Sequence, residues 1–155
     1  MTPTERYQAD VARGKITTDP EQTRVIGLLS DLSRGLQDRV QPAKGAWLQR
    51  LIVAARTRTT SLEPLQGIYL WGGVGRGKTY LMDLFFASVE GSSKLRTHFH
   101  RFMQDVHRRL VDLQGTTDPL ETIADELAER ATLICFDEFY VSDIGDAMLL
   151  GGLLK

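Results

Sequence analysis

Apolar residues recur at helical spacing through the first part of the chain, which predicts amphipathic helices there. A short helix is predicted over residues 4–12, closed by Gly14. A longer one begins at Asp19-Pro20, because Asp favours the N-cap and Pro suits the first helical position. The spacing breaks at 41–45 and resumes over 47–53. The apolar face predicted for the long helix is Val25, Leu29, Leu32 and Leu36.

From residue 67 onward the pattern changes to short apolar runs that alternate with helical segments, which is typical of an α/β fold. Strands are predicted at 68–71, 94–100 and 132–136, each followed by apolar residues at helical spacing. A start signal at Asp118-Pro119 predicts a helix before the third strand, and Ser142 or Asp143 is expected to cap the last one. The pattern predicts an N-terminal helical segment over 1–66 and an α/β domain over 67–155.

The first strand runs into a glycine-rich turn that has the spacing of a P-loop, with a strand before it and a helix after it. Glycines let several backbone N–H groups point into one concavity that holds a phosphate, and the helix N-terminus adds positive potential. Lys78 would reach the β- and γ-phosphates, and the Thr79 hydroxyl would bind Mg²⁺. The alternative is a glycine-rich turn that happens to precede Lys-Thr. The predicted nucleotide-binding residues are Gly72, Gly73, Val74, Gly75, Arg76, Gly77, Lys78 and Thr79.

The third predicted strand ends in two carboxylates, Asp137 and Glu138. Ligands of open parallel sheets bind at the C-terminal ends of the strands, so Asp137 is predicted to hold the Mg²⁺ that bridges the phosphates. Glu138 is then suited to orient and deprotonate the attacking water. The alternative is a strand that ends in a solvated acidic turn. Cys135, within the same strand, is expected to be a small buried apolar residue.

Composition adds mostly exclusions. A net charge of −1 and a pI near 6.3 give no general electrostatic reason to bind nucleic acid or an anionic membrane. A single cysteine rules out an internal disulfide, no apolar run is long enough to span a membrane, and the start resembles neither a signal nor a transit peptide. A cytoplasmic protein is expected. His98 and His100 would share one side of the second strand, but a third or fourth metal ligand is not seen nearby in the sequence.

Several motifs together resemble the ZapE-type cell-division ATPases, an AAA-type family shared with the mitochondrial lactation-elevated ATPases. The resemblance is dense over 67–155 and weak over the N-terminal helices. The motifs that follow the P-loop are more specific than the P-loop itself. They are Met82-Asp-Leu-Phe85, His98-Phe-His-Arg-Phe-Met103, Asp118-Pro-Leu120, Cys135-Phe-Asp-Glu-Phe139, Val141-Ser-Asp-Ile144 and Asp146-Ala-Met-Leu-Leu-Gly-Gly152.

The resemblance implies a Mg²⁺-dependent ATPase of the AAA type, with a parallel sheet and flanking helices. Residues 72–79 would be its Walker A segment, and Asp137 and Glu138 its Walker B pair. It implies remodelling of a protein partner, the division-ring protein FtsZ, by a homo-oligomer recruited to the division site. Protein quality control is the alternative role. The sequence departs from the family's usual residues at Tyr140 and Gly145, and neither position is a phosphate or metal ligand.

Members of the family also carry a sensor strand, an arginine finger and a C-terminal region beyond the Walker B strand. None of these is seen in this sequence, so it is expected to be an N-terminal fragment that hydrolyses ATP negligibly by itself. In the family the sensor strand lies between the two Walker strands.

Two other functions remain open from the residues. A P-loop kinase would transfer phosphate to a small molecule, although a glutamate beside the metal-binding aspartate suits activation of water. A nucleotide-dependent loader that acts on nucleic acid is disfavoured by the near-neutral charge.

Overall fold

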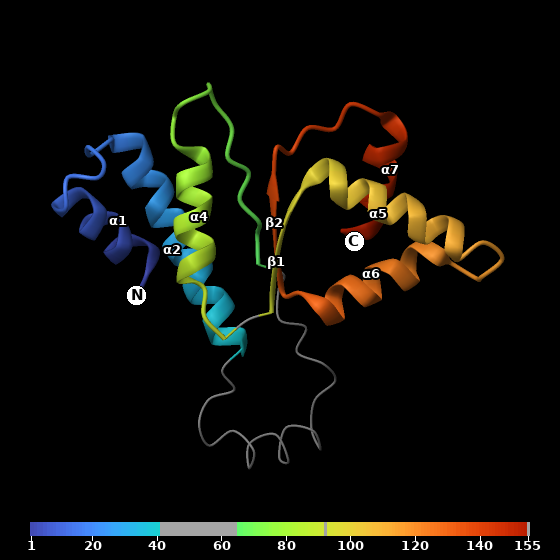
Figure 1. Ribbon diagram of the computed structural model, residues 1–155. Coiled ribbons are helices and arrows are strands. Elements are labelled where there is room, and N and C mark those ends of the chain that lie inside the picture. The colour runs from blue at the N-terminus through green and yellow to red at the C-terminus, as the bar shows by residue number, and fades with distance from the viewer. Residues whose placement is uncertain (41–64, 92, 155) are drawn as a thin grey trace, which may run out of the picture. The chain divides into compact units, whose positions relative to one another are not determined.

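The computed structural model describes residues 1–40, 65–91 and 93–154 (Figure 1). These residues divide into two compact units, Met1–Gly91 and Ser92–Lys155. Each unit is described by itself. The helix predicted over 47–53 lies outside the described residues. The division of the chain into domains at residue 66 stays a prediction.

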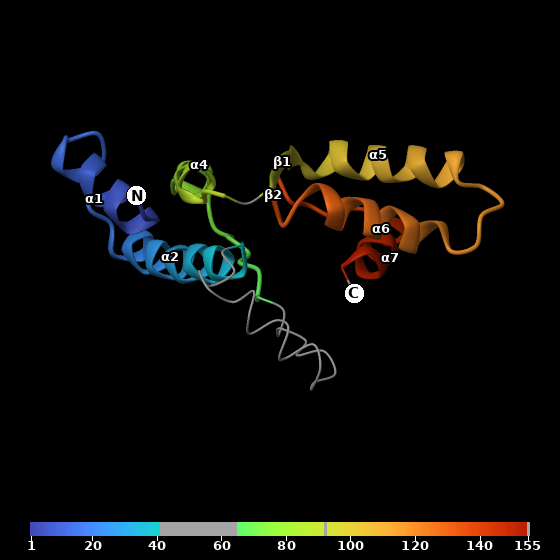
Figure 2. The ribbon, with the colours of Figure 1, turned by 90° about the horizontal axis from the view of Figure 1, so that it is seen from below.

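The described residues of unit 1 form three helices that lie against one another (Figures 1 and 2). They are α1 (Pro3–Ala12), α2 (Pro20–Val40) and α4 (Lys78–Ser88). α4 packs against both of the others, so the helix that follows the glycine-rich turn rests on the N-terminal helices. Its buried face consists of Leu81, Leu84, Phe85 and Ser88.

The N-terminal helices begin where the sequence predicts, because their caps satisfy the first N–H groups. Asp19 Oδ1 accepts hydrogen bonds from the amides of Glu21 and Gln22 at 2.8 and 3.2 Å. Thr2 and Glu5 form a reciprocal capping box on α1. Hydrophobic periodicity predicted the buried face of α2 correctly at Leu29 and Leu36, and the structure adds Ile26 and Ser33 to it.

The strand predicted at 68–71 is wrong for the described structure. Residues 65–73 have no regular secondary structure, and Tyr69 and Trp71 are 64% and 82% exposed. A strand is stable only when a neighbour pairs with its backbone N–H and C=O groups, and the described residues of unit 1 contain no strand. The segment has the apolar composition of a β-strand, but composition alone does not supply a neighbouring strand to which its backbone can hydrogen-bond.

Unit 2 is a small α/β unit. Its strands β1 (Lys94–His98) and β2 (Leu133–Asp137) are parallel neighbours in register Lys94↔Leu133 through His98↔Asp137. The crossover between them consists of two helices, α5 (Phe99–Asp112) and α6 (Pro119–Arg130), followed after β2 by α7 (Ile144–Leu153). Asp118 caps α6 and Asp143 caps α7, as the start signals indicate.

The predicted second strand is shorter than expected. β1 ends at His98 and α5 begins at Phe99, so the prediction that His98 and His100 alternate on one strand is wrong. Phe99 is almost fully buried in the first turn of α5. Burial of its ring there favours the start of a helix at this residue over continuation of the strand. His100 then lies in α5, within hydrogen-bond distance of Gln104.

An aromatic cluster forms the core of unit 2 beneath the end of β2. Phe136 meets Phe102 with ring centroids 4.8 Å apart, and Phe139 meets Phe99 at 4.6 Å. Helices α5, α6 and α7 supply the rest of this core, which therefore fixes the C-terminal end of β2 to the helices around it. The buried members are Phe99, Phe102, Met103, Val106, Ile123, Leu150 and Leu153.

Among the described residues, no helix has the length and apolarity that crossing a bilayer requires.

Candidate nucleotide site

The glycine-rich turn has the backbone that a phosphate loop needs. Gly72, Gly75 and Gly77 have φ angles of 140°, 80° and 82°, which other residues adopt only with strain. Gly77 is the N-cap of α4 and places no side chain over the helix end. The N–H groups of the first turn of α4 therefore face outward at the positive end of the helix, which is a favourable position for an anion.

Lys78 spans the turn. Its Nζ donates hydrogen bonds to the carbonyl oxygens of Gly72 at 2.9 Å and Gly73 at 2.8 Å. The ammonium thus lies against the backbone of the first two glycines, on the loop where phosphate oxygens are expected. Thr79, the next residue, is exposed on the first turn of α4. Val74 and Arg76 are exposed at the tip of the turn.

The N-terminal helices hold the turn from one side. Gln22, in α2, donates from Nε2 to the carbonyl oxygen of Arg76 at 3.2 Å. A Cβ at Gly77 would come within 2.8 Å of the same nitrogen. Gln22 in turn interacts with the hydroxyl of Tyr7 at 3.3 Å, and that hydroxyl accepts from the amide of Asp19. The shape of the glycine-rich turn therefore depends on a residue more than fifty positions earlier in the chain.

An open hollow of about 400 Å³ lies beside the turn, within unit 1. The loop that joins α1 to α2 forms one wall and the P-loop with α4 forms the other. Its volume is within the range of small-molecule sites. The lining residues are Gly14, Lys15, Ile16, Thr17, Gln22, Gly75, Gly77 and Tyr80.

Two of the lining residues, Tyr80 and Lys15, are held in place by contacts with Asp10. The Tyr80 hydroxyl donates to Asp10 Oδ2 at 3.0 Å, and Lys15 Nζ lies 3.1 Å from Asp10 Oδ1. Burial, supported by the Asp10 carboxylate, raises the pKa of Tyr80 to about 12. The contacts with Lys15 and Tyr80 lower the pKa of Asp10 below its usual value. Tyr80 is therefore a neutral donor at physiological pH.

The two predicted carboxylates lie in unit 2, at the C-terminal end of β2. Asp137 is the last residue of the strand and accepts from Arg96 Nε at 2.9 Å. Glu138 follows with a φ of 51°, a left-handed conformation that is uncommon outside glycine. Its side chain is exposed. Strain of this kind, which costs about 1–3 kcal/mol, is often retained where a side chain must point in a defined direction.

Cys135 is buried inside β2, as expected, with 8% of its surface exposed. Burial raises the pKa of its thiol to about 11, against the opposing influence of Arg96. It is therefore a packed thiol rather than a nucleophile.

Each of the two predicted Mg²⁺ ligands, Thr79 in unit 1 and Asp137 in unit 2, carries an oxygen donor of the kind that suits this ion. Thr79 offers a hydroxyl and Asp137 a carboxylate, which are the hard oxygen ligands that Mg²⁺ selects. In the part of the chain that the structure describes, His, Cys, Asp and Glu form no group of three that could hold a metal. A site with one or two protein ligands, completed by phosphates and water, is the usual arrangement for Mg²⁺-nucleotides.

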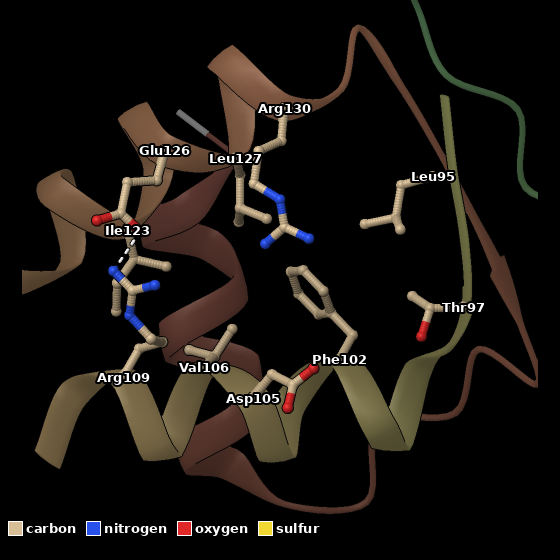
Figure 3. Close-up of a pocket in the computed structure, with 10 residues that line it drawn as sticks. All are labelled: Leu95, Thr97, Phe102, Asp105, Val106, Arg109, Ile123, Glu126, Leu127 and Arg130. Carbon is tan, nitrogen blue, oxygen red and sulfur yellow. Dashed lines mark hydrogen bonds and ion pairs between the residues drawn. The ribbon is translucent and has the colours of Figure 1, made fainter. Parts of the chain in front are cut away.

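A second hollow, of about 110 Å³, lies in unit 2 among β1, α5 and α6 (Figure 3). Phe102 and Val106 form its apolar side, and Arg109 pairs with Glu126 at its rim. It contains none of the residues that the sequence assigns to nucleotide chemistry.

Comparison with known proteins identifies the family. The model of the AFG1-like ATPases matches residues 1–155. The chain belongs to the AFG1-like ATPase family. The recognition of a ZapE-type ATPase from the sequence motifs is thereby confirmed.

The AFG1-like relatives include the cell division protein ZapE of Escherichia coli K12 and of strain O157:H7, each 46% identical over 158 aligned residues. Both alignments cover all of this chain and 42% of the relative. Lactation elevated protein 1 homolog B of Danio rerio is 48% identical over 59% of this chain and 20% of its own length. The chain thus spans less than half the length of these relatives. No solved structure matched it.

Sequence reasoning missed Gln22, Tyr80 and the Asp10–Lys15 pair. No motif marks them, because they reach the phosphate loop through the packing of α1 and α2 on α4. The Asp19-Pro20 start signal gave the only hint, since it sets the register that brings Gln22, three residues on, to the turn.

Proposed function

We propose that this AFG1-like ATPase binds ATP with Mg²⁺ and hydrolyses it. The observation that carries the proposal is the phosphate loop itself, with left-handed glycines, an open helix N-terminus and Lys78 lying along it. In this proposal Gly72 to Thr79 cradle the phosphates, and Lys78 exchanges its two carbonyl contacts for phosphate oxygens.

The nucleoside half of ATP would lie in the hollow beside the loop. That hollow adjoins Gly75 and Gly77, so a nucleotide whose phosphates lie on the loop has room for its sugar and base there. Lys15 and Thr17 offer polar groups on the opposite wall, and Ile16 offers apolar surface for a base.

Hydrolysis is assigned to the carboxylates of unit 2. From their motifs, Thr79 and Asp137 are the proposed Mg²⁺ ligands, and the cation would neutralise the charge that develops during phosphoryl transfer. Glu138, exposed and without a role in the core, would orient the attacking water and accept its proton.

The coupled task is proposed from the relatives. Two of them carry the name cell division protein, which supports a role in bacterial cell division. Within that role we propose remodelling of a protein partner, with FtsZ as the candidate. A homo-oligomer in the cytoplasm that is recruited to the division site would perform it. Protein quality control, which the resemblance to the lactation-elevated ATPases implies, is the alternative role.

Release of inorganic phosphate by the full-length protein, measured without any acceptor substrate, tests hydrolysis and separates it from the kinase alternative. Wild type should release phosphate. Glu138→Gln should bind a fluorescent ATP analogue as wild type does but lose hydrolysis by a factor on the order of 10²–10⁴, the usual contribution of a general base. Normal hydrolysis in Glu138→Gln would show that another group is the base. Phosphate transfer only in the presence of an acceptor would favour a kinase.

A further inference from the structure

Arg96 and Asp137 share one face of the two-stranded sheet. Arg96 is opposite Cys135 in the register, and Asp137 lies two positions further along β2, so the two side chains are diagonal neighbours. The other face carries Phe136, whose ring packs on α5. Arg96 and Asp137 therefore lie on the face of the sheet opposite to the aromatic core, together with Cys135.

The contact between them is direct. Arg96 Nε lies 2.9 Å from Asp137 Oδ2. The Arg96 side chain is 32% exposed and that of Asp137 is 16% exposed, so the pair is more shielded than the other ion pairs described in this unit. One oxygen of the carboxylate assigned to Mg²⁺ is thus already in contact with a cation that belongs to the protein.

We infer that Arg96 competes with Mg²⁺ for the carboxylate of Asp137, and that Arg96 thereby lowers the metal affinity of the site. This inference rests on the proposed function. Mg²⁺ requires ligand oxygens at about 2.0–2.1 Å in near-octahedral geometry. A guanidinium on the same carboxylate both occupies a lone pair and repels the incoming divalent ion.

The exchange has a consequence for the free protein. With Arg96 in place, Asp137 remains paired and oriented, which avoids leaving a half-buried carboxylate without a counter-charge. A bound Mg²⁺ would give the same carboxylate a second positive partner. Arg96 is thus a positioning residue that acts through Asp137, by the contact that it makes in the protein without metal.

The test is the affinity of Mn²⁺, used as a paramagnetic substitute for Mg²⁺, for the full-length protein saturated with a non-hydrolysable ATP analogue. Electron paramagnetic resonance of free Mn²⁺ gives the dissociation constant without turnover. Arg96→Ala should bind Mn²⁺ more tightly, by a factor on the order of ten, from the loss of a like charge at this range. Arg96→Lys, which keeps the charge, should stay within about threefold of wild type.

Arg108→Ala is the matched control. Arg108 is an arginine of the same unit that pairs with Asp105 at 2.7 Å, on the exposed side of α5. Its removal changes the net charge equally and should leave Mn²⁺ affinity unchanged. In an Asp137→Asn background, Arg96→Ala should no longer alter the affinity, because the carboxylate through which it acts is gone.

Unchanged or weaker Mn²⁺ binding in Arg96→Ala would overturn the inference. The nucleotide analogue is titrated separately without metal, so a failure of nucleotide binding is distinguished from a failure of the Arg96 assignment. If Asp137→Asn binds Mn²⁺ as wild type does, the proposed metal ligand is wrong and the inference falls with it. Thermal unfolding of each variant confirms that it is folded.

Discussion

Lys78 brings a full charge against the backbone of the glycine-rich turn. Its two contacts are to carbonyl oxygens of the loop itself, so the loop and its cation are organised before any phosphate arrives. Pre-organisation of this kind reduces the ordering that binding must impose.

Lys78→Ala is therefore expected to weaken nucleotide binding by at least about tenfold, the equivalent of one charge-assisted hydrogen bond. Titration of a fluorescent ATP analogue measures it. Arg24→Ala is the control, because Arg24 is an exposed cation of the same unit that pairs only locally with Glu21. Equal affinity in Lys78→Ala and wild type would remove Lys78 from the site.

Cys135 reports the integrity of the strand that carries Asp137. Its thiol pKa is raised to about 11 by burial, so the folded protein holds the thiol proton more tightly than the unfolded chain does. Its contribution to stability is present below the ordinary thiol pKa of about 9 and is lost as the pH rises toward 11.

We expect the Cys135 thiol of the native protein to react with iodoacetamide at pH 8 at least about a hundredfold more slowly than that of the denatured protein, because its thiolate fraction and its access are both reduced. Mass spectrometry after timed quenching measures the two rates. Rapid labelling of the native protein would show that β2 opens or is exposed.

At the scale of elements, the turn before α4 contains a glycine whose replacement is expected to strain the backbone. Gly77 combines a left-handed φ with the close approach of Gln22. Gly27, within α2, has a helical backbone, and no atom lies within 4 Å of the position that a Cβ would occupy there.

Gly77→Ala should lower the free energy of unfolding by about 1–2 kcal/mol, the cost of the left-handed backbone for a residue with a Cβ. It should weaken nucleotide binding as well. Gly27→Ala should instead raise stability by about 0.5–1 kcal/mol, since it improves helix propensity without a clash. Urea unfolding compares the two, and an equal effect of both would mean that the φ of Gly77 relaxes in solution.

The helices and their starts could be predicted from local chemistry, because Asp19, Asp118 and Asp143 bond to amides within three residues of themselves. Two features could not be predicted from local chemistry. The strand at 68–71 requires a partner that local sequence does not specify. The end of β1 depends on the burial of Phe99 against residues about forty positions later.

For the candidate site the same division holds. The glycines, Lys78 and the acidic pair form contiguous motifs whose chemistry can be predicted from their spacing. Gln22 and Tyr80 are glutamine and tyrosine side chains in helices, with nothing in the sequence to distinguish them from surface residues. Their role follows from the packing of three helices, which spacing does not reveal.

At the scale of the whole molecule, ligand binding should raise the free energy of unfolding. A nucleotide that binds the folded protein and not the unfolded chain stabilises it by about 2.7 kcal/mol at a hundred times its dissociation constant. We expect an ATP analogue to raise the unfolding midpoint of the wild type in a concentration-dependent way. The same concentrations should shift Lys78→Ala much less, and an equal shift in both would place the ligand elsewhere.

The aromatic cluster of unit 2 has one more consequence. Phe136 and Phe139 bracket Asp137 and Glu138 in the chain, and both rings are held by Phe99. The backbone that carries the acidic pair is therefore held at both ends by packed rings. The direction of the two carboxylates depends on the packing of these phenylalanines. If ATP turnover is under selection, substitutions of these phenylalanines should be tolerated nearly as rarely as substitutions of the two carboxylates.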